Sequence, residues 1–132
     1  MIVKALHQAQ LKSNEIDYVE AHGTGTSLGD PIEIRAMSQV LGNRDQPLLI
    51  SSVKTYIGHL EAAAGMASVI KVLLALQKQE IPQNLHFNKL NDNIKIPAGL
   101  DLVIPTTNYA WPSGGIPRVA GVSGFALREY PP

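Results

Sequence analysis

Residues 16–33 read IDYVEAHGTGTSLGDPIE, and this stretch decides the expected fold. The apolar run 16–21 predicts a buried strand, and a polar, glycine-rich segment follows it from His22 onward. A helix is then expected, with Asp30 as its N-cap and Glu33, three residues later, as the second half of a capping box. A strand, a glycine-rich turn and a helix in succession are typical of an α/β unit.

The remaining segments continue this alternation of strands and helices. Residues 48–53 predict a second strand, residues 54–59 a loop, and residues 60–78 a long helix. That helix has so little polar surface that we expect it to be buried nearly all round. Three further elements are expected from the same patterns: a helix at 2–12 and strands at 100–107 and 118–122. The predicted fold class is α/β, a mixed sheet covered by helices, in one domain over residues 1–132.

Composition excludes several classes of function. The chain is 45% hydrophobic and 17% charged, which is typical of a globular protein. Its 11 basic and 11 acidic residues balance, so we expect neither a nucleic-acid nor a membrane partner. No signal region or long apolar span is recognisable, and a cytoplasmic location is expected. With no cysteine, the chain itself holds no disulfide, no thiolate metal site and no cysteine nucleophile, and no metal site is expected.

The first candidate site residue is His22, at the end of the first predicted strand. The glycines that follow allow close approach of the backbone to a ligand, and the hydroxyls of Thr24 and Thr26 can hydrogen-bond to it. A lone histidine at a strand end is more often structural than catalytic, and we interpret His7 and His86 as structural. The interpretation of His22 therefore depends on the residues that accompany it.

A second histidine, His59, follows Gly58 at the expected start of the long helix. Backbone N–H groups and the helix dipole favour developing negative charge at such a position. Lys54 and Glu61 flank it, and a buried lysine requires a carboxylate or carbonyl partner. Two imidazoles, an ammonium group and a helix N-terminus together suit the stabilisation of an enolate or oxyanion.

Other motifs fail on spacing or on composition. Gly23, Gly25 and Gly29 approach a dinucleotide fingerprint, but the third glycine falls one position too late. The H-x-E spacing of His59 and Glu61 matches zinc deaminases, whose cysteine pair is impossible in this chain. The sequence GVSG at 121–124 lacks the spacing of a G-x-S-x-G nucleophile elbow.

Five stretches in order resemble the β-ketoacyl synthases, and most of all the ketosynthase domains of modular polyketide synthases. They are IDYVEAHGTGTSLGDPIE at 16–33, PLLISSVKTYIGHLEAAAGMASVIKVLLALQ at 47–77, IPQNLHF at 81–87, AWP at 110–112 and PRVAGVS at 117–123. The resemblance implies a thiolase-like fold, in which two similar α/β halves stack in five layers. This chain resembles only the C-terminal half.

The resemblance also implies roles for individual residues. His22, in the HGTGT motif, and His59, in the GH-x-E motif, match the histidine pair that assists decarboxylation of a malonyl-type extender and stabilises the enolate and the thioester oxyanion. Lys54 matches the lysine that orients this network, and Glu61 matches its carboxylate partner. The hydroxyls that contact the phosphopantetheine arm are matched by Thr24 and Thr26.

The implied function is decarboxylative Claisen condensation of carrier-bound acyl and malonyl thioesters, in a polyketide or fatty-acid context. The implied partners are an N-terminal ketosynthase half bearing the cysteine and an acyl carrier protein, with a dimer in the intact family. No cofactor is expected on the chain, since the phosphopantetheine arm serves as substrate carrier. Without a cysteine the chain is not expected to condense alone. The alternatives are a non-catalytic remnant that binds carrier protein or pantetheine, and an inactive truncated product.

Two departures from the family pattern stand out. Tyr56 occupies a position where relatives usually have asparagine, in the loop before His59. From about residue 124 the tail GFALREYPP differs from the family's Gly/Phe-rich catalytic loop, which ends near TNAH. An early stop or a shifted reading frame would produce such an ending, and we expect the chain to be truncated there.

Overall fold

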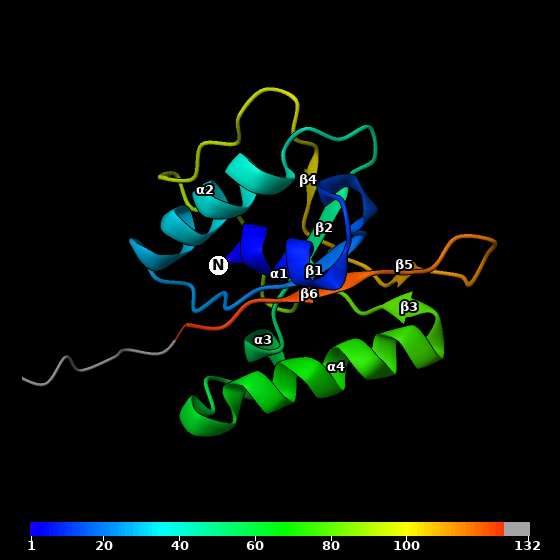
Figure 1. Ribbon diagram of the computed structural model, residues 1–132. Coiled ribbons are helices and arrows are strands. Elements are labelled where there is room, and N and C mark those ends of the chain that lie inside the picture. Colours follow the sequence, from blue (N-terminus) through cyan, green and yellow to red (C-terminus); the bar gives the residue numbers. More distant parts are fainter. Residues whose placement is uncertain (126–132) are drawn as a thin grey trace, which may run out of the picture.

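A four-stranded parallel sheet forms the centre of the structure, a computed structural model that describes residues 1–125 (Figure 1). The strand order is β4-β2-β1-β6. Its members are β1 (Tyr18–Glu20), β2 (Leu48–Ser51), β4 (Leu102–Val103) and β6 (Ala120–Val122). Neighbouring strands are parallel in all three pairings, so their carboxyl ends meet at one edge.

Helices cover both faces of this sheet and make three layers (Figure 1). One face carries α1 (Ile2–Ala9) and α2 (Gly29–Leu41), and the other carries α3 (Lys54–Ile57) and α4 (Ala64–Lys78). The core on the α1/α2 side is built from Ile16, Val19, Ala21, Ile34, Met37, Leu41, Leu48, Ile50 and Leu100. The core on the α4 side is built from Tyr18, Leu49, Val72, Ala75, Ile81 and Trp111.

The α/β class predicted from the sequence is confirmed, with differences in detail. The main sheet is parallel rather than mixed, and the antiparallel pairing belongs to a separate pair, β3 (Glu80–Ile81) with β5 (Tyr109–Ala110). The segment 54–59, expected as a loop, contains α3. The long helix does not begin at residue 60, because Gly58 at φ 71° turns the chain and a 3₁₀ turn, Glu61–Ala63, precedes α4. A second 3₁₀ turn, Ser13–Glu15, follows α1.

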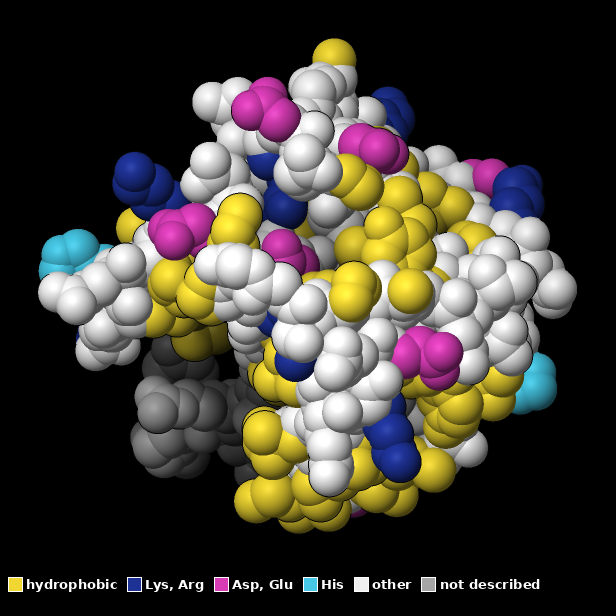
Figure 2. Space-filling view, turned by 90° about the vertical axis from the view of Figure 1, so that its right-hand side faces the viewer, with side chains coloured by type: hydrophobic (Ala, Val, Ile, Leu, Met, Phe, Trp, Pro, Cys, Tyr) yellow, Lys and Arg dark blue, Asp and Glu magenta, His cyan; other side chains and the backbone are white. Residues whose placement is uncertain are grey.

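The expectation that the long helix is buried nearly all round is wrong. Its inner side consists of Ala64, Ser68, Lys71, Val72 and Ala75, at helical spacing. Large apolar side chains point outward and are exposed: Met66, Val69, Ile70, Leu73 and Leu74, which we call the outer face of α4. Through Val72 and Ala75 this inner side packs in one core cluster with Tyr18, Ile81 and Trp111. Hydrophobic side chains accordingly gather along the lower edge of Figure 2, at the level of α4 in Figure 1.

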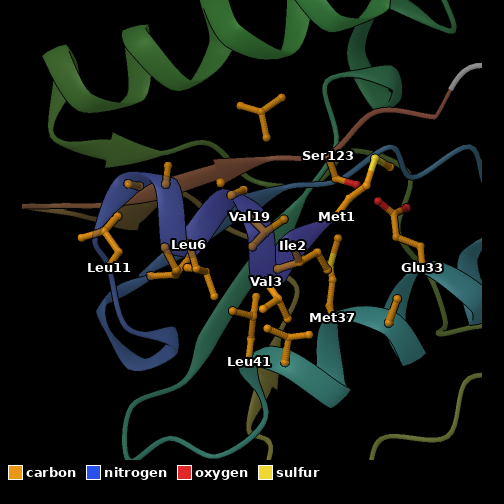
Figure 3. A pocket seen from close by; sticks show the side chains of 18 of the residues that line it. Met1, Ile2, Val3, Leu6, Leu11, Val19, Glu33, Met37, Leu41 and Ser123 are labelled. Atoms are coloured by element: carbon orange, nitrogen blue, oxygen red, sulfur yellow. The ribbon is translucent and has the colours of Figure 1, made fainter.

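A cavity of about 690 Å³ lies between α1, α2 and the edge strand β6 (Figure 3). Ile2, Leu6, Val19 and Met37 line it with other apolar side chains, and Glu33 and Ser123 add polar atoms. Neither His22 nor His59 lines it, so this cavity is not the candidate site. Within residues 1–125, no helix combines the length and apolar character needed to cross a membrane.

Two leucines of equal size test this distribution of burial. Leu48→Ala empties a fully buried position in β2, so we expect the free energy of unfolding to fall by about 2–5 kcal/mol. Leu73→Ala removes an exposed side chain, so a change within about 0.5 kcal/mol is expected. Urea unfolding of both variants measures the difference. Equal destabilisation would contradict the outward orientation of Leu73.

Candidate active site

The loop that carries His22 is held by two carboxylates of α2. The two carboxylate oxygens of Glu33 accept hydrogen bonds from the backbone N–H groups of His22 (2.8 Å) and Gly23 (2.9 Å). Asp30 accepts one from the N–H of Gly25 (3.1 Å). The expected capping box is therefore wrong: the N-cap of α2 is Leu28, and both acids bind the preceding loop. Buried Glu33 fixes the backbone on which the imidazole of His22 stands.

Glycine is required directly after this histidine. Gly23 has φ 47°, and a Cβ atom added to it would lie 2.8 Å from the Cβ of Ser52. Both the left-handed backbone and this close approach exclude a side chain. The loop after β1 thus packs against the segment after β2, which leads to the second histidine.

His59 lies between α3 and the 3₁₀ turn that precedes α4. Its Nδ1 accepts a hydrogen bond from the backbone N–H of Glu61 (3.0 Å). The expected placement of His59 at the start of the long helix is wrong, since α4 begins only at Ala64. The N–H group at the start of the turn binds the imidazole, so it orients the side chain rather than facing a developing oxyanion.

The structure brings the two histidines together. The ring centroids of His22 and His59 are 5.2 Å apart, with an interplanar angle of 84°. The Nδ1 of His22 accepts the backbone N–H of Phe125 (3.4 Å), whose ring also packs against this imidazole. Because both Nδ1 atoms act as acceptors, each neutral imidazole carries its proton on Nε2. Two N–H donors are therefore available beside each other.

Local electrostatics favour the neutral form of His22. Burial lowers the pKa of His22, and the positive charge of Lys54 lowers it further, while the carboxylate of Glu33 opposes these effects. Burial also lowers the pKa of Lys54, against the opposing charges of Glu20 and Glu33. Lys54, the first residue of α3, thus supplies a positive potential close to His22.

Glu61 does not pair with Lys54, contrary to the sequence-based expectation. The ion pairs within residues 1–125 are Lys71–Glu20 (2.8 Å) and Lys89–Asp92 (2.6 Å). Glu61 is exposed, at φ 48°, and contributes its backbone N–H to His59. The carboxylates that act on the pKa of Lys54 come instead from β1 and α2.

The two threonines after His22 lie close to one another in the same loop. Their Oγ1 atoms are 3.4 Å apart, and that of Thr26 accepts the backbone N–H of Gly29 at the start of α2 (3.0 Å). Thr26 is exposed and Thr24 is half-buried. Their contact with a phosphopantetheine arm remains a prediction. Among the described residues, no group of three or more metal-ligating side chains gathers in one place.

Two site-forming side chains are not predicted by any motif in the sequence, Glu20 and Lys71. Both are buried, and they form an ion pair between β1 and α4. A signal for them exists, since Lys71 is the single charged residue of the apolar stretch 62–76, Glu20 lies in the predicted buried strand 16–21, and the two charges are opposite. Buried charges require such partners.

Comparisons with known proteins identify the family of the chain. The profile of the family described as "Beta-ketoacyl synthase, C-terminal domain" matches residues 1–88. A phenolphthiocerol/phthiocerol polyketide synthase chain of Mycobacterium tuberculosis is 52% identical over 126 residues, which cover 93% of the present chain and 7% of the relative. Erythronolide synthase EryA3 of Saccharopolyspora erythraea is 46% identical over 130 residues, covering 96% of the present chain and 4% of the relative.

Solved structures show the same likeness. Ketosynthase twelve of the bacillaene polyketide synthase from Bacillus amyloliquefaciens superposes with a TM-score of 0.84 at 40% identity, over 91% of this chain and 22% of that one. An oxazolomycin ketosynthase domain from Streptomyces albus gives 0.83 at 38% identity, over 92% and 22%. The chain belongs to the β-ketoacyl synthase C-terminal domain family and corresponds to part of a ketosynthase domain of modular polyketide synthases.

The tail for which a departure from the family is predicted lies mostly beyond the described part of the chain. The departure predicted from about residue 124 concerns GFALREYPP, of which residues 126–132 lie outside the described residues. Of the tail, Phe125 is described, and it contacts His22.

Replacing Lys54 tests the electrostatics of the site. In Lys54→Met the positive charge that lowers the pKa of His22 is gone, so this pKa should rise toward the ordinary histidine value. NMR titration of the imidazole Cε1–H signals measures it, with Lys4→Met on α1 as control. An unchanged or lower pKa of His22 in Lys54→Met would show that Lys54 does not act on this imidazole.

Proposed function

We propose that this chain supplies the histidine half of a ketosynthase active site that condenses carrier-bound acyl and malonyl thioesters with loss of CO₂. The observation that carries the proposal is the pair formed by His22 and His59, with ring centroids 5.2 Å apart and both Nδ1 atoms occupied by backbone N–H groups. Two Nε2–H donors side by side suit a single thioester oxygen on which negative charge develops.

The proposed chemistry begins with the malonyl thioester. Its thioester carbonyl oxygen accepts hydrogen bonds from Nε2–H of His22 and of His59. The bond to the carboxylate carbon breaks, CO₂ leaves, and the electron pair forms an enolate whose oxygen stays between the two donors. The enolate carbon then attacks the carbonyl of an acyl group held as a cysteine thioester, and the thiolate leaves. Lys54 adds positive potential, which favours the enolate and the neutral state of His22.

The nucleophile belongs to a partner in this proposal, because the chain contains no cysteine. An N-terminal ketosynthase half would supply the cysteine, and an acyl carrier protein would deliver the extender on its phosphopantetheine arm. Thr24 and Thr26 support delivery by the phosphopantetheine arm, since their hydroxyls lie in the same loop as His22. Carrier-protein binding without catalysis is the alternative for the same residues.

The outer face of α4 is the surface on which we expect the N-terminal half to pack. Five large apolar side chains are exposed along one helix, and such a continuous patch is typical of an interface. A groove of about 590 Å³ borders it, lined by Tyr56 of α3, Ile70 of α4 and Leu60 from the segment between these helices, among other residues. Burial of this face would also bring a partner close to His59, which lies shortly before α4 in the chain.

Removing one donor tests the histidine pair. In a complex of this chain with a cysteine-bearing N-terminal half, His59→Ala should lower the rate of malonyl-thioester decarboxylation by about 10²–10³-fold, or roughly 3 kcal/mol, as for loss of one oxyanion donor. His7→Ala, on the exposed surface of α1, is the matched control and should leave the rate unchanged. Equal rates for His59→Ala and the unaltered chain would remove His59 from the mechanism.

A charge on the outer face of α4 tests the partner. Leu73→Glu should prevent co-purification with the N-terminal half, because a carboxylate would be buried without a counter-charge. Ile116→Glu, at an 83% exposed position far from α4 in the sequence, is the control and should leave the complex intact. A complex that tolerates Leu73→Glu would place the interface elsewhere.

A further inference from the structure

Glu20, the last residue of β1, is fully buried and binds groups from its own strand, from the turn before α3 and from α4. Its Oε1 accepts the backbone N–H of Val53 (2.5 Å). Its Oε2 accepts the hydroxyl of Tyr18 and pairs with Nζ of Lys71 (2.8 Å). The two oxygens therefore have separate roles. Oε1 binds the backbone at Val53, and Oε2 pairs with the positive charge of Lys71.

The charge of Lys71 has further partners besides this carboxylate. Its Nζ donates to the hydroxyl of Ser51 (2.7 Å) and lies 5.9 Å and 5.7 Å from the ring centroids of Tyr18 and Tyr56. Electron-rich ring faces at this distance stabilise an ammonium group. Lys71 thus makes no use of the oxygen that faces Val53.

The hydrogen bond between Glu20 and the Val53 N–H lies next to Lys54, a residue of the candidate site. Val53 is the N-cap residue of α3, and Lys54 is the first residue of that helix. Glu20 itself stands two residues before His22. One carboxylate therefore connects the strand that leads to His22 with the helix that begins at Lys54. Asn84 holds the neighbouring N–H of Ser52 (3.1 Å) and so supports the same turn.

We propose that Glu20 is a positioning residue for Lys54: its Oε1 anchors the Val53 amide and so fixes the start of α3 beside the histidine pair. Its relevance to catalysis rests on the function proposed above. The competing interpretation is that Glu20 serves only to neutralise Lys71. The two interpretations predict different results when both charges are removed together.

Two double variants separate anchoring from neutralisation. The amide variant, Glu20→Gln with Lys71→Met, lacks both charges but keeps a side-chain oxygen for the Val53 N–H. The apolar variant, Glu20→Met with Lys71→Met, lacks both charges and that oxygen. Replacing a buried ion pair by side chains of similar volume is compatible with folding. Both variants retain Glu33 and His22, the other titratable groups that act electrostatically with Lys54.

Measurements on the full chain alone test the anchor. We expect the Val53 amide to exchange with solvent at least about tenfold faster in the apolar variant than in the amide variant, since loss of its bond permits local opening. The Lys54 pKa, followed by NMR of the labelled lysine side chain, should be higher in the apolar variant because burial is its main lowering cause. The amides of β1 paired with β2 report whether both variants stay folded. Equal exchange at Val53 and equal Lys54 titration in the two folded variants would overturn the proposal.

The consequence for catalysis is measured in the complex with a cysteine-bearing half. The apolar variant should lose about 10²-fold in kcat for decarboxylation with little change in KM, as for displacement of a catalytic group by about an ångström, and the amide variant should recover most of this. Equal kcat for the two variants would overturn the link to Lys54. If the unaltered complex itself shows no decarboxylation, the proposed function fails, and the exchange and titration results still decide whether Glu20 anchors α3.

Discussion

The parallel pairing of β1 with β2 is the constraint on which the candidate site depends. Their register sets Glu20 opposite Ser51, so the two strands end at the same level. The loop to His22 and the turn to Lys54 leave the sheet at that edge. Open parallel sheets place their binding sites at the carboxyl ends of strands for this reason. Antiparallel pairing would send the two loops to opposite edges and separate the histidines.

Carboxylates bound to backbone then reduce the freedom of each loop. Glu33 holds the N–H groups at His22, and Glu20 holds the N–H at Val53. A carboxylate that accepts from backbone N–H groups makes a charge-assisted bond, stronger than one between neutral groups. Glu33 thereby fixes the backbone of His22, and the imidazole of His59 is oriented by the backbone N–H of Glu61. Such preorganisation is what an oxyanion-stabilising site requires.

The residue pattern predicts the elements around His22 but not the direction in which the strands pair. The strand before His22 and the helix after it follow from an apolar run and a polar, glycine-rich turn, and both are present. The sense of the strand pairing does not follow, because short apolar runs carry no information on direction. The hydrogen bonds from the preceding loop to Glu33 and Asp30 are not predicted, because a capping box uses the same residue types at the same spacing.

The orientation of α4 is a second feature that the sequence pattern does not predict. Its segment is apolar on nearly every side, so periodicity alone does not indicate which side faces the sheet. Lys71 determines which side of α4 faces the sheet, because Glu20 and Ser51, the partners of its ammonium group, lie on the inner side. The large residues are thereby turned outward. A single buried ion pair thus links the assembly of the site to the exposure of the surface proposed for the partner.

The most direct measurement is the release of CO₂ from a malonyl group on an acyl carrier protein, in a complex of this chain with an N-terminal half whose nucleophilic cysteine is replaced by alanine. We expect CO₂ release to continue although condensation is abolished, because in the proposed mechanism decarboxylation uses the donors of His22 and His59 and not the nucleophile. A folded complex with both histidines intact that releases no CO₂ would contradict the assignment of the enolate-stabilising site to this chain.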